Sequence, residues 1–260
     1  MILDELAAHA RERVAAARAR VPLEEIRARA EALPRGDFRF EKALAGKGTA
    51  FICEIKKASP SKGVIDPQFD YIGIAGQYEE AGADCISMLT EPKWFLGSDD
   101  IFRAVRLTVD APMLRKDFTV DAYQIYEARV LGADAVLLIC ALLDTDTLRE
   151  YLAICDQLGL SALVETHDEA EMQSAVAAGA RLIGVNNRNL RDFSVDLGNA
   201  ARLRAGAPEG TIFVAESGVS CPEDAAKLRQ AGADAILVGE YLMRSPDKQG
   251  ALQALREAAK

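Results

Sequence analysis

One short phrase recurs four times along the chain and restricts its possible folds more than any other feature. It appears as AGADCISMLTE from Ala81, LGADAVLLIC from Leu131, AAGARLIGVNN from Ala177 and AGADAILVGE from Ala231. Each copy follows an amphipathic stretch and opens an apolar run. Because glycine takes the left-handed conformation that ends a helix, each phrase predicts a helix that stops before a buried strand. The apolar runs are continuous, which favours parallel strands covered by helices.

The phrases recur at intervals of about 50 residues, roughly twice one strand–helix unit, so another strand is expected within each interval. The candidates are APMLRKDF from Ala111, LSALVET from Leu160 and TIFVAESG from Thr211, and TAFICEIKK from Thr49 precedes them all. The eight predicted strands lie near 50–56, 84–90, 111–116, 134–140, 160–165, 181–186, 211–217 and 234–239. Eight such units in about 210 residues predict an α/β protein with a closed (β/α)8 TIM barrel. An open doubly wound sheet is the alternative.

The segment before the first strand is predicted to be helical. We expect helices over residues 2–20 and 23–32, broken by Pro22 and Pro34. The chain is thus interpreted as a single domain, 1–260, with an N-terminal helical extension at 1–48 and the barrel at 49–260. We expect the extension to cover the active-site mouth, and the alternative is a plug over one barrel end that takes no part in chemistry.

Composition narrows the class of protein. The formal net charge of −9 argues against non-specific nucleic-acid binding, which needs a basic surface. The chain has no signal-peptide pattern and no run long enough to span a bilayer, so no membrane partner is predicted. Five cysteines without a C-x-x-C pair suggest reduced thiols and a cytoplasmic protein. The two histidines, His9 and His167, are far apart in sequence, and no metal site is predicted.

Charged residues stand at the ends of several predicted strands, where the active sites of TIM barrels lie. Side chains two residues apart on a strand point to the same face. Parity therefore directs one set of polar residues into the mouth: Glu54, Lys56, Lys116, Glu165 and Asn186. Opposite charges enclosed together shift each other's pKa values, as acid–base catalysis requires. For any one residue, a solvated charge or a structural ion pair is the alternative.

Two glycine motifs indicate an anion site. ESGV begins at Glu216 and LVGE begins at Leu237, and they end the seventh and eighth predicted strands. Glycine lets backbone N–H groups approach a ligand, and the loops after these two strands often bind phosphate in such barrels. The alternative is that these glycines only form turns.

Two loops could border the same mouth. Ser59, Ser61 and Lys62 stand in a turn after the first strand, where they could close over a ligand or remain solvated. Trp94 and Phe95 could line an apolar ring site or anchor their loop.

The sequence resembles the indole-3-glycerol-phosphate synthase family of tryptophan biosynthesis along essentially its whole length. The matching phrases are CEIKKASPSKG, LTEPKWFLGS, LRKDFTVDAYQIYEAR, GADAVLLI, LVETHDEAE, GVNNRNL, AESGV and LVGEYLM, with ILDELAAHARERV similar to the family's first helix. The resemblance implies ring closure of 1-(2-carboxyphenylamino)-1-deoxyribulose 5-phosphate to indole-3-glycerol phosphate, with loss of carbon dioxide and water. It implies no cofactor, a sugar-phosphate substrate, and other enzymes of tryptophan biosynthesis as partners.

The resemblance also implies roles for individual residues. Lys116 corresponds to a general acid, Glu165 to the general base of dehydration, and Glu54 with Lys56 to residues that assist proton transfer and position the substrate. Asn186, Ser217 and Arg188 match further site residues of the family. The candidate catalytic residues are Glu54, Lys56, Lys116, Glu165, Asn186 and Ser217, and the candidate substrate-binding residues are Ser59, Arg188, Gly218 and Gly239.

One residue departs from the usual pattern. Glu240 stands where many phosphate-binding barrels carry serine or threonine, so its side chain is expected to point away from the phosphate. Two other functions stay open: a sister barrel that acts on a related sugar phosphate as an isomerase or lyase, and a non-catalytic binding or scaffold barrel. The first would need a different acid–base pair, and the second has no reason to collect charges in its mouth.

Overall fold

Eight parallel strands close into a barrel in the computed structural model, which describes residues 2–46, 48–190 and 192–260. Neighbouring strands follow chain order, and the first strand closes the ring by pairing with the last. The strands are β1 (Ala50–Ile55), β4 (Cys85–Leu89), β5 (Met113–Lys116), β6 (Ala135–Ile139), β7 (Ser161–Thr166), β8 (Leu182–Asn186), β9 (Ile212–Glu216) and β10 (Ala235–Val238). The closed barrel and its eight predicted strands are confirmed, with every strand boundary within two residues of the expected one.

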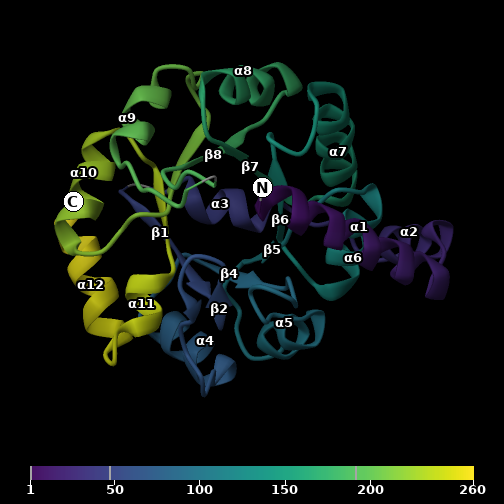
Figure 1. The fold of residues 1–260 in the computed structure, drawn as a ribbon, viewed down its shortest axis with the longest axis horizontal. Helices are drawn as coiled ribbons and strands as arrows, with labels where there is room; N and C mark the ends of the chain where they lie inside the picture. The colour runs from purple at the N-terminus through teal and green to yellow at the C-terminus, as the bar shows by residue number, and fades with distance from the viewer. Residues whose placement is uncertain (1, 47, 191) are drawn as a thin grey trace.

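Helices surround the barrel (Figure 1). They are α4 (Tyr71–Glu80), α5 (Asp99–Arg106), α6 (Ala122–Leu131), α7 (Thr145–Leu158), α8 (Glu169–Ala178), α9 (Gly198–Arg204), α10 (Pro222–Gln230), α11 (Glu240–Arg244) and α12 (Lys248–Ala258). The glycine of each recurring phrase has a left-handed backbone, with φ of 81° at Gly82, 88° at Gly132, 91° at Gly179 and 89° at Gly232. These four glycines therefore end helices as predicted, because the conformation carries no steric penalty for glycine.

Strand residues alternate between two apolar cores. Cys53 and Ile55 of β1 belong to the outer core between barrel and helices. Ile52, one position away, belongs to the inner core, which also contains Leu163 of β7 and Val214 of β9. Residues of the same parity further along these strands must therefore lie inside the barrel at its carboxyl end.

The N-terminal segment covers both ends of the barrel. It forms α1 (Ile2–Arg20), α2 (Leu23–Glu31) and α3 (Arg39–Leu44). In Figure 1, α1 lies across the barrel and α2 extends past α6 at the edge. The start of α1 borders the mouth, as expected, whereas α3 inserts Phe40 into the inner core at the opposite end. The proposed cover and its alternative, the plug, are thus both present.

A short hairpin follows the first barrel strand. Its strands, β2 (Ala58–Ser59) and β3 (Gly63–Val64), pair antiparallel, and the hairpin includes the predicted turn. The Ala58 N–H donates to the carbonyl of Phe95, which joins the hairpin to the loop after β4. In the described part of the chain, no helix combines the length and apolar composition that crossing a bilayer requires.

Candidate active site

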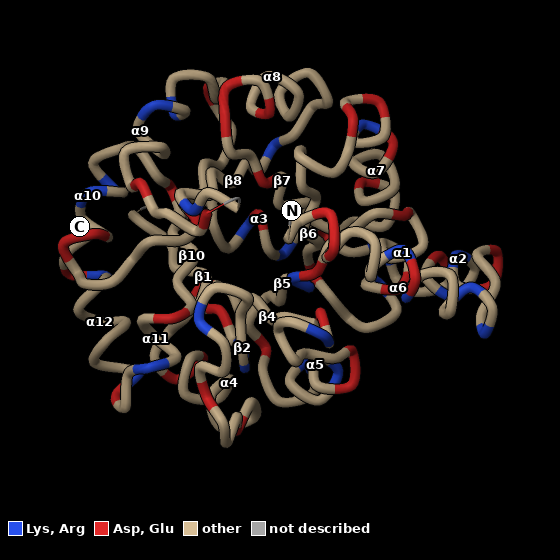
Figure 2. Tube along the Cα trace, in the orientation of Figure 1, with Lys and Arg blue, Asp and Glu red and all other residues tan. Residues whose placement is uncertain are grey.

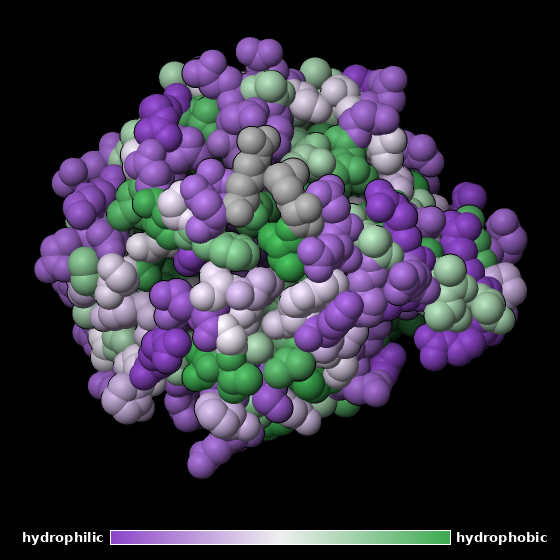
Figure 3. Space-filling model, viewed as in Figure 1, coloured by the Kyte–Doolittle hydropathy of each residue, from purple (hydrophilic) through white to green (hydrophobic). Residues whose placement is uncertain are grey.

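A cavity of about 570 Å³ opens at the carboxyl ends of the strands. Figure 2 shows acidic and basic residues at strand ends near the centre of the ring, and Figure 3 shows this face of the molecule with polar residues around a few apolar ones. The cavity wall includes all ten candidate residues from the sequence, namely Glu54, Lys56, Ser59, Lys116, Glu165, Asn186, Arg188, Ser217, Gly218 and Gly239. Strand parity brings together Glu54, Lys56, Lys116, Glu165 and Asn186, and the segments that follow the strands bring the other five residues to the same cavity.

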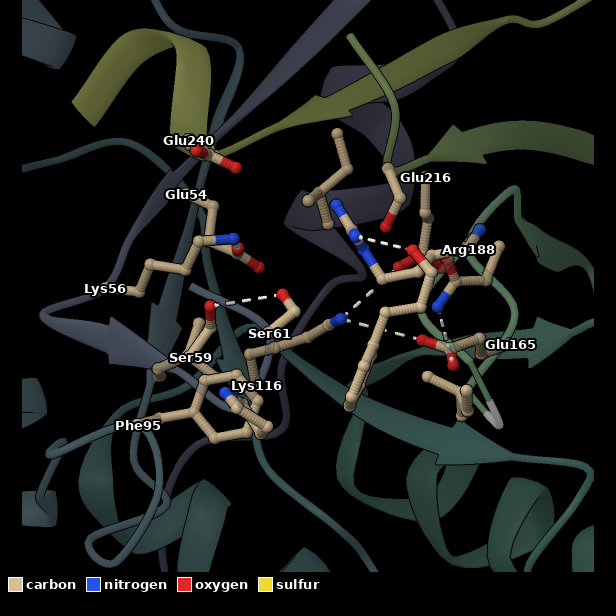
Figure 4. Close-up of a pocket in the computed structure, with 18 of the residues that line it drawn as sticks. Glu54, Lys56, Ser59, Ser61, Phe95, Lys116, Glu165, Arg188, Glu216 and Glu240 are labelled. Atoms are coloured by element: carbon tan, nitrogen blue, oxygen red, sulfur yellow. Dashed lines mark hydrogen bonds and ion pairs between the residues drawn. The ribbon is translucent and has the colours of Figure 1, made fainter. Parts of the chain in front are cut away.

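Lys116 occupies the centre of the charged cluster (Figure 4). Its Nζ lies 3.3 Å from Glu216 Oε2 and 3.6 Å from Glu165 Oε2. Burial alone would lower the pKa of this ammonium, but the carboxylates of Glu216, Glu165 and Glu54 outweigh burial and raise its pKa above the ordinary value. The free site therefore holds Lys116 as a charged ammonium.

Glu54 and Lys56 form the enclosed pair that the first strand predicts. Lys56 Nζ donates to Glu54 Oε1 at 2.7 Å, and Ser87 Oγ donates to Glu54 Oε2 at 3.4 Å. Burial would raise the pKa of Glu54, but Lys56 and Lys116 lower it below its usual range. A Cβ at Gly239 would lie 2.7 Å from both Glu54 Oε1 and Lys56 Nζ, so this glycine gives the pair its space.

Glu165 is buried on β7 and surrounded by donors and cations. Besides Lys116, Asn186 Nδ2 donates to Oε1 at 3.2 Å, and His167 Nε2 lies 3.3 Å from the same oxygen. Burial would raise the pKa of Glu165, but Lys116 and His167 lower it to about 2. Glu165 is therefore an ionised carboxylate in the free site.

Glu216 belongs to the same cluster, although the sequence prediction omitted it. Its side chain is 1% exposed and its Oε1 has no hydrogen-bond partner among the described residues. Burial raises the pKa of Glu216 to about 7, because Lys116 compensates only in part and Glu165 adds repulsion. The signal for this residue was present, since Glu216 has the same parity as Val214 of the inner core.

The residues after β9 have an unusual backbone. Ser217 has a φ of 67° and Gly218 a φ of 94°, so two consecutive residues are left-handed. The conformation at Ser217 costs roughly 1 kcal/mol relative to a right-handed one. Such strain is often retained at functional sites, where it aims backbone groups.

Three residues at the rim of the cavity, Ser59, Arg188 and Glu240, contact neighbouring residues of the described chain rather than one another. Arg188 Nη1 donates to the carbonyl of Phe193 at 3.1 Å, and Ser59 Oγ lies 3.5 Å from Ser61 Oγ. The carboxylate of Glu240 contacts Arg244 Nε at 3.0 Å and Lys62 Nζ at 3.5 Å, so two cations offset its charge.

The two aromatic residues of the loop after β4 differ in position. Phe95 lines the cavity, where its ring lies 6.1 Å from that of Phe118. Trp94 contacts His9 at 5.5 Å between ring centroids, and Lys93 Nζ lies over the Trp94 ring, 4.4 Å from its centroid. Phe95 is therefore available to a ligand, and Trp94 anchors its loop to α1.

Two polar side-chain contacts fasten α1 over the mouth. His9 Nδ1 lies 3.0 Å from Glu91 Oε1, and Arg13 Nη2 donates to Asp117 Oδ1 at 2.6 Å. Asp117 directly follows Lys116, so the helix is tied to the strand that carries the central lysine.

The arrangement suits proton transfer to and from one small substrate. It offers the buried ammonium of Lys116 and, next to it, two carboxyl groups. Glu165 is ionised, and the pKa of Glu216 is near neutrality. Groups with such separated pKa values can act as acid and base at the same pH.

Comparison with known proteins shows which family the chain resembles over its length. The family model described as "Indole-3-glycerol phosphate synthase" matches residues 3–255. The chain is 55% identical over 260 residues to the indole-3-glycerol phosphate synthase of Ruminiclostridium cellulolyticum, covering 100% of both chains. It is 46% identical over 268 residues to the protein of that name from Lachnoclostridium phytofermentans, covering 98% of this chain and 99% of the relative.

Solved structures with low sequence identity share the fold. A 3-hexulose-6-phosphate synthase superposes with a TM-score of 0.64 at 18% identity, covering 82% of this chain and 100% of that one. The tryptophan synthase α subunit of Legionella pneumophila superposes with a TM-score of 0.60 at 16% identity, covering 85% and 98%. At these identities the likeness concerns the barrel alone.

Proposed function

The chain belongs to the indole-3-glycerol phosphate synthase family, and from this premise we propose how its charged cluster closes an indole ring. The enzyme converts 1-(2-carboxyphenylamino)-1-deoxyribulose 5-phosphate to indole-3-glycerol phosphate, carbon dioxide and water. The observation that carries the residue roles is the position of Lys116 Nζ, within 3.6 Å of two buried carboxylates of unlike pKa.

Lys116 is the general acid of ring closure. A carbon–carbon bond forms between the ring carbon that bears the carboxylate and the ketone carbon of the sugar chain, while the ketone oxygen takes a proton from Nζ. The lysine is protonated beforehand because three carboxylates surround it. A positioned acid of this kind contributes about 10²–10⁴-fold to rate.

Closure leaves the aromatic ring of the substrate positively charged. The carboxylates around Lys116 stabilise this cation. Carbon dioxide then leaves from the ring carbon, and its bonding electron pair restores the aromatic ring. The Lys116 amine then regains a proton from solvent and passes it to the new hydroxyl, which departs as water. Glu165 removes the proton whose loss makes the five-membered ring aromatic.

The remaining cavity residues orient the substrate. Glu54 and Lys56 position it and assist proton transfer, and Asn186 keeps the Glu165 carboxylate in place through its 3.2 Å hydrogen bond. Ser217 and Arg188 contribute polar contacts at the rim. The anilino ring packs against Phe95 and Phe118, which belong to the apolar part of the wall.

The phosphate binds beside Gly218 and Gly239, with Ser59 facing it across the mouth. Two features support this proposal: the left-handed backbone at Ser217 and Gly218, and the Lys56 ammonium next to Gly239. Backbone N–H groups and a nearby cation are the usual means of holding a phosphate. The enzyme acts in the cytoplasm, and other tryptophan-pathway enzymes are its proposed partners.

Two measurements test the proposal. Purified protein given the substrate should produce the fluorescence of indole-3-glycerol phosphate, and absence of this product would refute the activity. A crystal structure with the product bound should place the phosphate within hydrogen-bond distance of the Gly218 and Gly239 N–H groups. A phosphate held elsewhere would refute the site while leaving the activity intact.

A further inference from the structure

We infer that His167 decides which of the two carboxylates beside Lys116 stays ionised: it holds Glu165 as the base and leaves the proton to Glu216. The inference rests on the proposed role of Glu165 and assigns His167 as a positioning residue that acts through it. The family match does not by itself explain why one of two buried glutamates on the same lysine should be the base.

The two glutamates share Lys116 but otherwise have unequal surroundings. Glu165 also has Asn186 Nδ2 at 3.2 Å and His167 Nε2 at 3.3 Å. Glu216 has only the Lys116 contact at 3.3 Å among the described residues, and its other oxygen has no hydrogen-bond partner. That oxygen faces Gly184, where a Cβ would lie 2.1 Å from it. A second cation on one side therefore breaks the symmetry of the pair.

His167 reaches Glu165 from outside the substrate cavity. It lines a second cavity of about 710 Å³, which shares Asn186 and Arg188 with the first. Of these two cavities, Glu165 lines the substrate cavity and not the second, and His167 lines the second and not the substrate cavity. The His167 Nε2 contact is an ion pair rather than an aligned hydrogen bond, because the nitrogen has no hydrogen-bond partner of good geometry in the described chain. Substrate can thus take Lys116 from Glu165 without disturbing His167.

A second carboxylate fixes the imidazole. Glu171 Oε2 lies 3.0 Å from His167 Nδ1 and accepts the backbone N–H of His167 at 2.8 Å. Asn199 Nδ2 donates to the His167 carbonyl at 3.1 Å. Burial would lower the pKa of His167, but Glu165 and Glu171 raise it to about 10. The ring is therefore an imidazolium at neutral pH.

The wider surroundings of the imidazole also favour its charged form. The titratable and charged groups around it, on the elements that form the second cavity and the cluster, are Asp4, Lys116, Cys140, Glu165, Asp168, Glu171, Arg188, Asp196, Arg202 and Glu216. Acidic groups outnumber the bases. Cys140 does not compete for charge, because burial raises the pKa of its thiol to about 12.

A purely structural role is the competing explanation. Asp168 caps α8 by accepting the Glu171 N–H at 2.9 Å, and Glu171 in turn accepts the N–H of His167. Such reciprocal caps stabilise the start of a helix, and His167 could serve only to complete this one. The two roles differ in how they depend on pH.

The kinetic test is the variant His167→Gln, which keeps a donor and removes the charge. Below pH 7 the single proton of the pair would then be shared between Glu165 and Glu216, so kcat should fall about tenfold with KM within twofold. The deficit should shrink above pH 8, where both carboxylates are ionised, and the acid limb of kcat should move up by about one pH unit. A deficit independent of pH with a lowered Tm would overturn the inference in favour of the helix cap.

Two further variants, Glu171→Gln and His9→Gln, serve as controls for this test. Glu171→Gln removes the charge behind His167 and should shift the acid limb in the same direction by less, and the double variant should match His167→Gln alone. If His167→Gln does not fold, an unshifted limb in Glu171→Gln overturns the inference. His9→Gln, which breaks an imidazole–carboxylate pair on α1 instead, should leave the limb where it is.

A measurement without turnover completes the test. Carboxyl ¹³C NMR of glutamate-labelled protein at pH 6, assigned with Glu165→Gln and Glu216→Gln, should place the proton on Glu216 in the native protein. In His167→Gln, Glu165 should take up part of it, and an unchanged distribution would overturn the inference. Full kcat in Glu165→Gln would instead refute the proposed base, which distinguishes the two failures.

Discussion

The same N-terminal segment closes both ends of the barrel, but one end buries apolar side chains and the other encloses charged ones. At the amino end, α3 inserts Phe40 and Leu44 into the inner core, both at most 1% exposed. Its backbone is tied down as well, since the Glu41 N–H donates to Ser161 Oγ at 3.2 Å. At the carboxyl end, α1 covers a charged cavity in which Glu216 Oε1 has no hydrogen-bond partner among the described residues.

The difference separates stability from chemistry within one barrel. Apolar burial at the amino end lowers the free energy of the fold, at roughly 25 cal/mol per Å² of buried apolar surface. Buried charge at the carboxyl end costs free energy unless every member is paired. Three carboxylates around Lys116 are tolerated because they shift each other's pKa values toward useful ones.

The largest expected effect is that of Lys116→Met. The kcat should fall by about 10⁴-fold, because the general acid is lost. From the sequence alone, stability is expected to be unchanged or improved, since functional charges are often strained. The three carboxylates around Nζ reverse that expectation: above pH 7 the variant should unfold at a lower temperature and recover as falling pH protonates them.

Steady-state fluorescence and calorimetry at pH 6 and pH 8 would measure both effects. Lys42→Met is the matched control at the other end of the barrel, because Lys42 pairs with Asp37 at an exposed site. Near-normal kcat in Lys116→Met would contradict the proposal that the carboxyl end carries the chemistry and the amino end the stability.

Phe40→Ala should produce the reverse pattern. The side chain is fully buried in the inner core, so its removal should lower the free energy of unfolding by about 3–5 kcal/mol. The folded fraction should keep its kcat, because α3 lies at the end opposite the cavity. Urea unfolding combined with kcat per folded molecule measures this, and a large loss of kcat at unchanged stability would contradict it.

Glu216→Gln gives the smallest effect and the one most specific to pH. The pKa of Glu216 is about 7 in the folded protein against an ordinary 4.5, so the folded state binds a proton that the unfolded state has lost. Native stability therefore falls as pH rises from about 4.5 to 7, by about 3 kcal/mol at 1.36 kcal/mol per pKa unit.

The glutamine variant should not show this fall. Its stability relative to the native protein should increase between pH 5 and pH 8, as thermal unfolding at several pH values would reveal. A difference that stays constant with pH would mean that Glu216 is ionised throughout.

Much of the fold could be predicted because its signals are local. The recurring glycines and continuous apolar runs give eight strands, and parity brings Lys116 and Glu165 together. The helix α3 was missed because six residues carry too little periodicity, and burial of Phe40 rather than helix propensity holds it. Glu216 was missed although its parity with Val214 was available.

His167 could not be placed from the sequence. Its partners come from two elements, Glu165 on β7 and Glu171 on α8, and only the three-dimensional arrangement shows that its ring lies between them. The pKa values of the cluster likewise depend on burial and on distances that strand parity does not supply.

The most direct test of the account compares the kcat of Glu165→Gln and Glu127→Gln in the product fluorescence assay. Glu127→Gln is the control, because it makes the same substitution outside the cavity. There Glu127 Oε2 accepts a hydrogen bond from Arg115 at 2.7 Å. Glutamine keeps the size of the side chain and removes its basicity, so kcat should fall by about a hundredfold or more at residue 165 and by less than about threefold at residue 127. Equal activities in the two variants would contradict the assignment of Glu165 as the base that completes the indole ring.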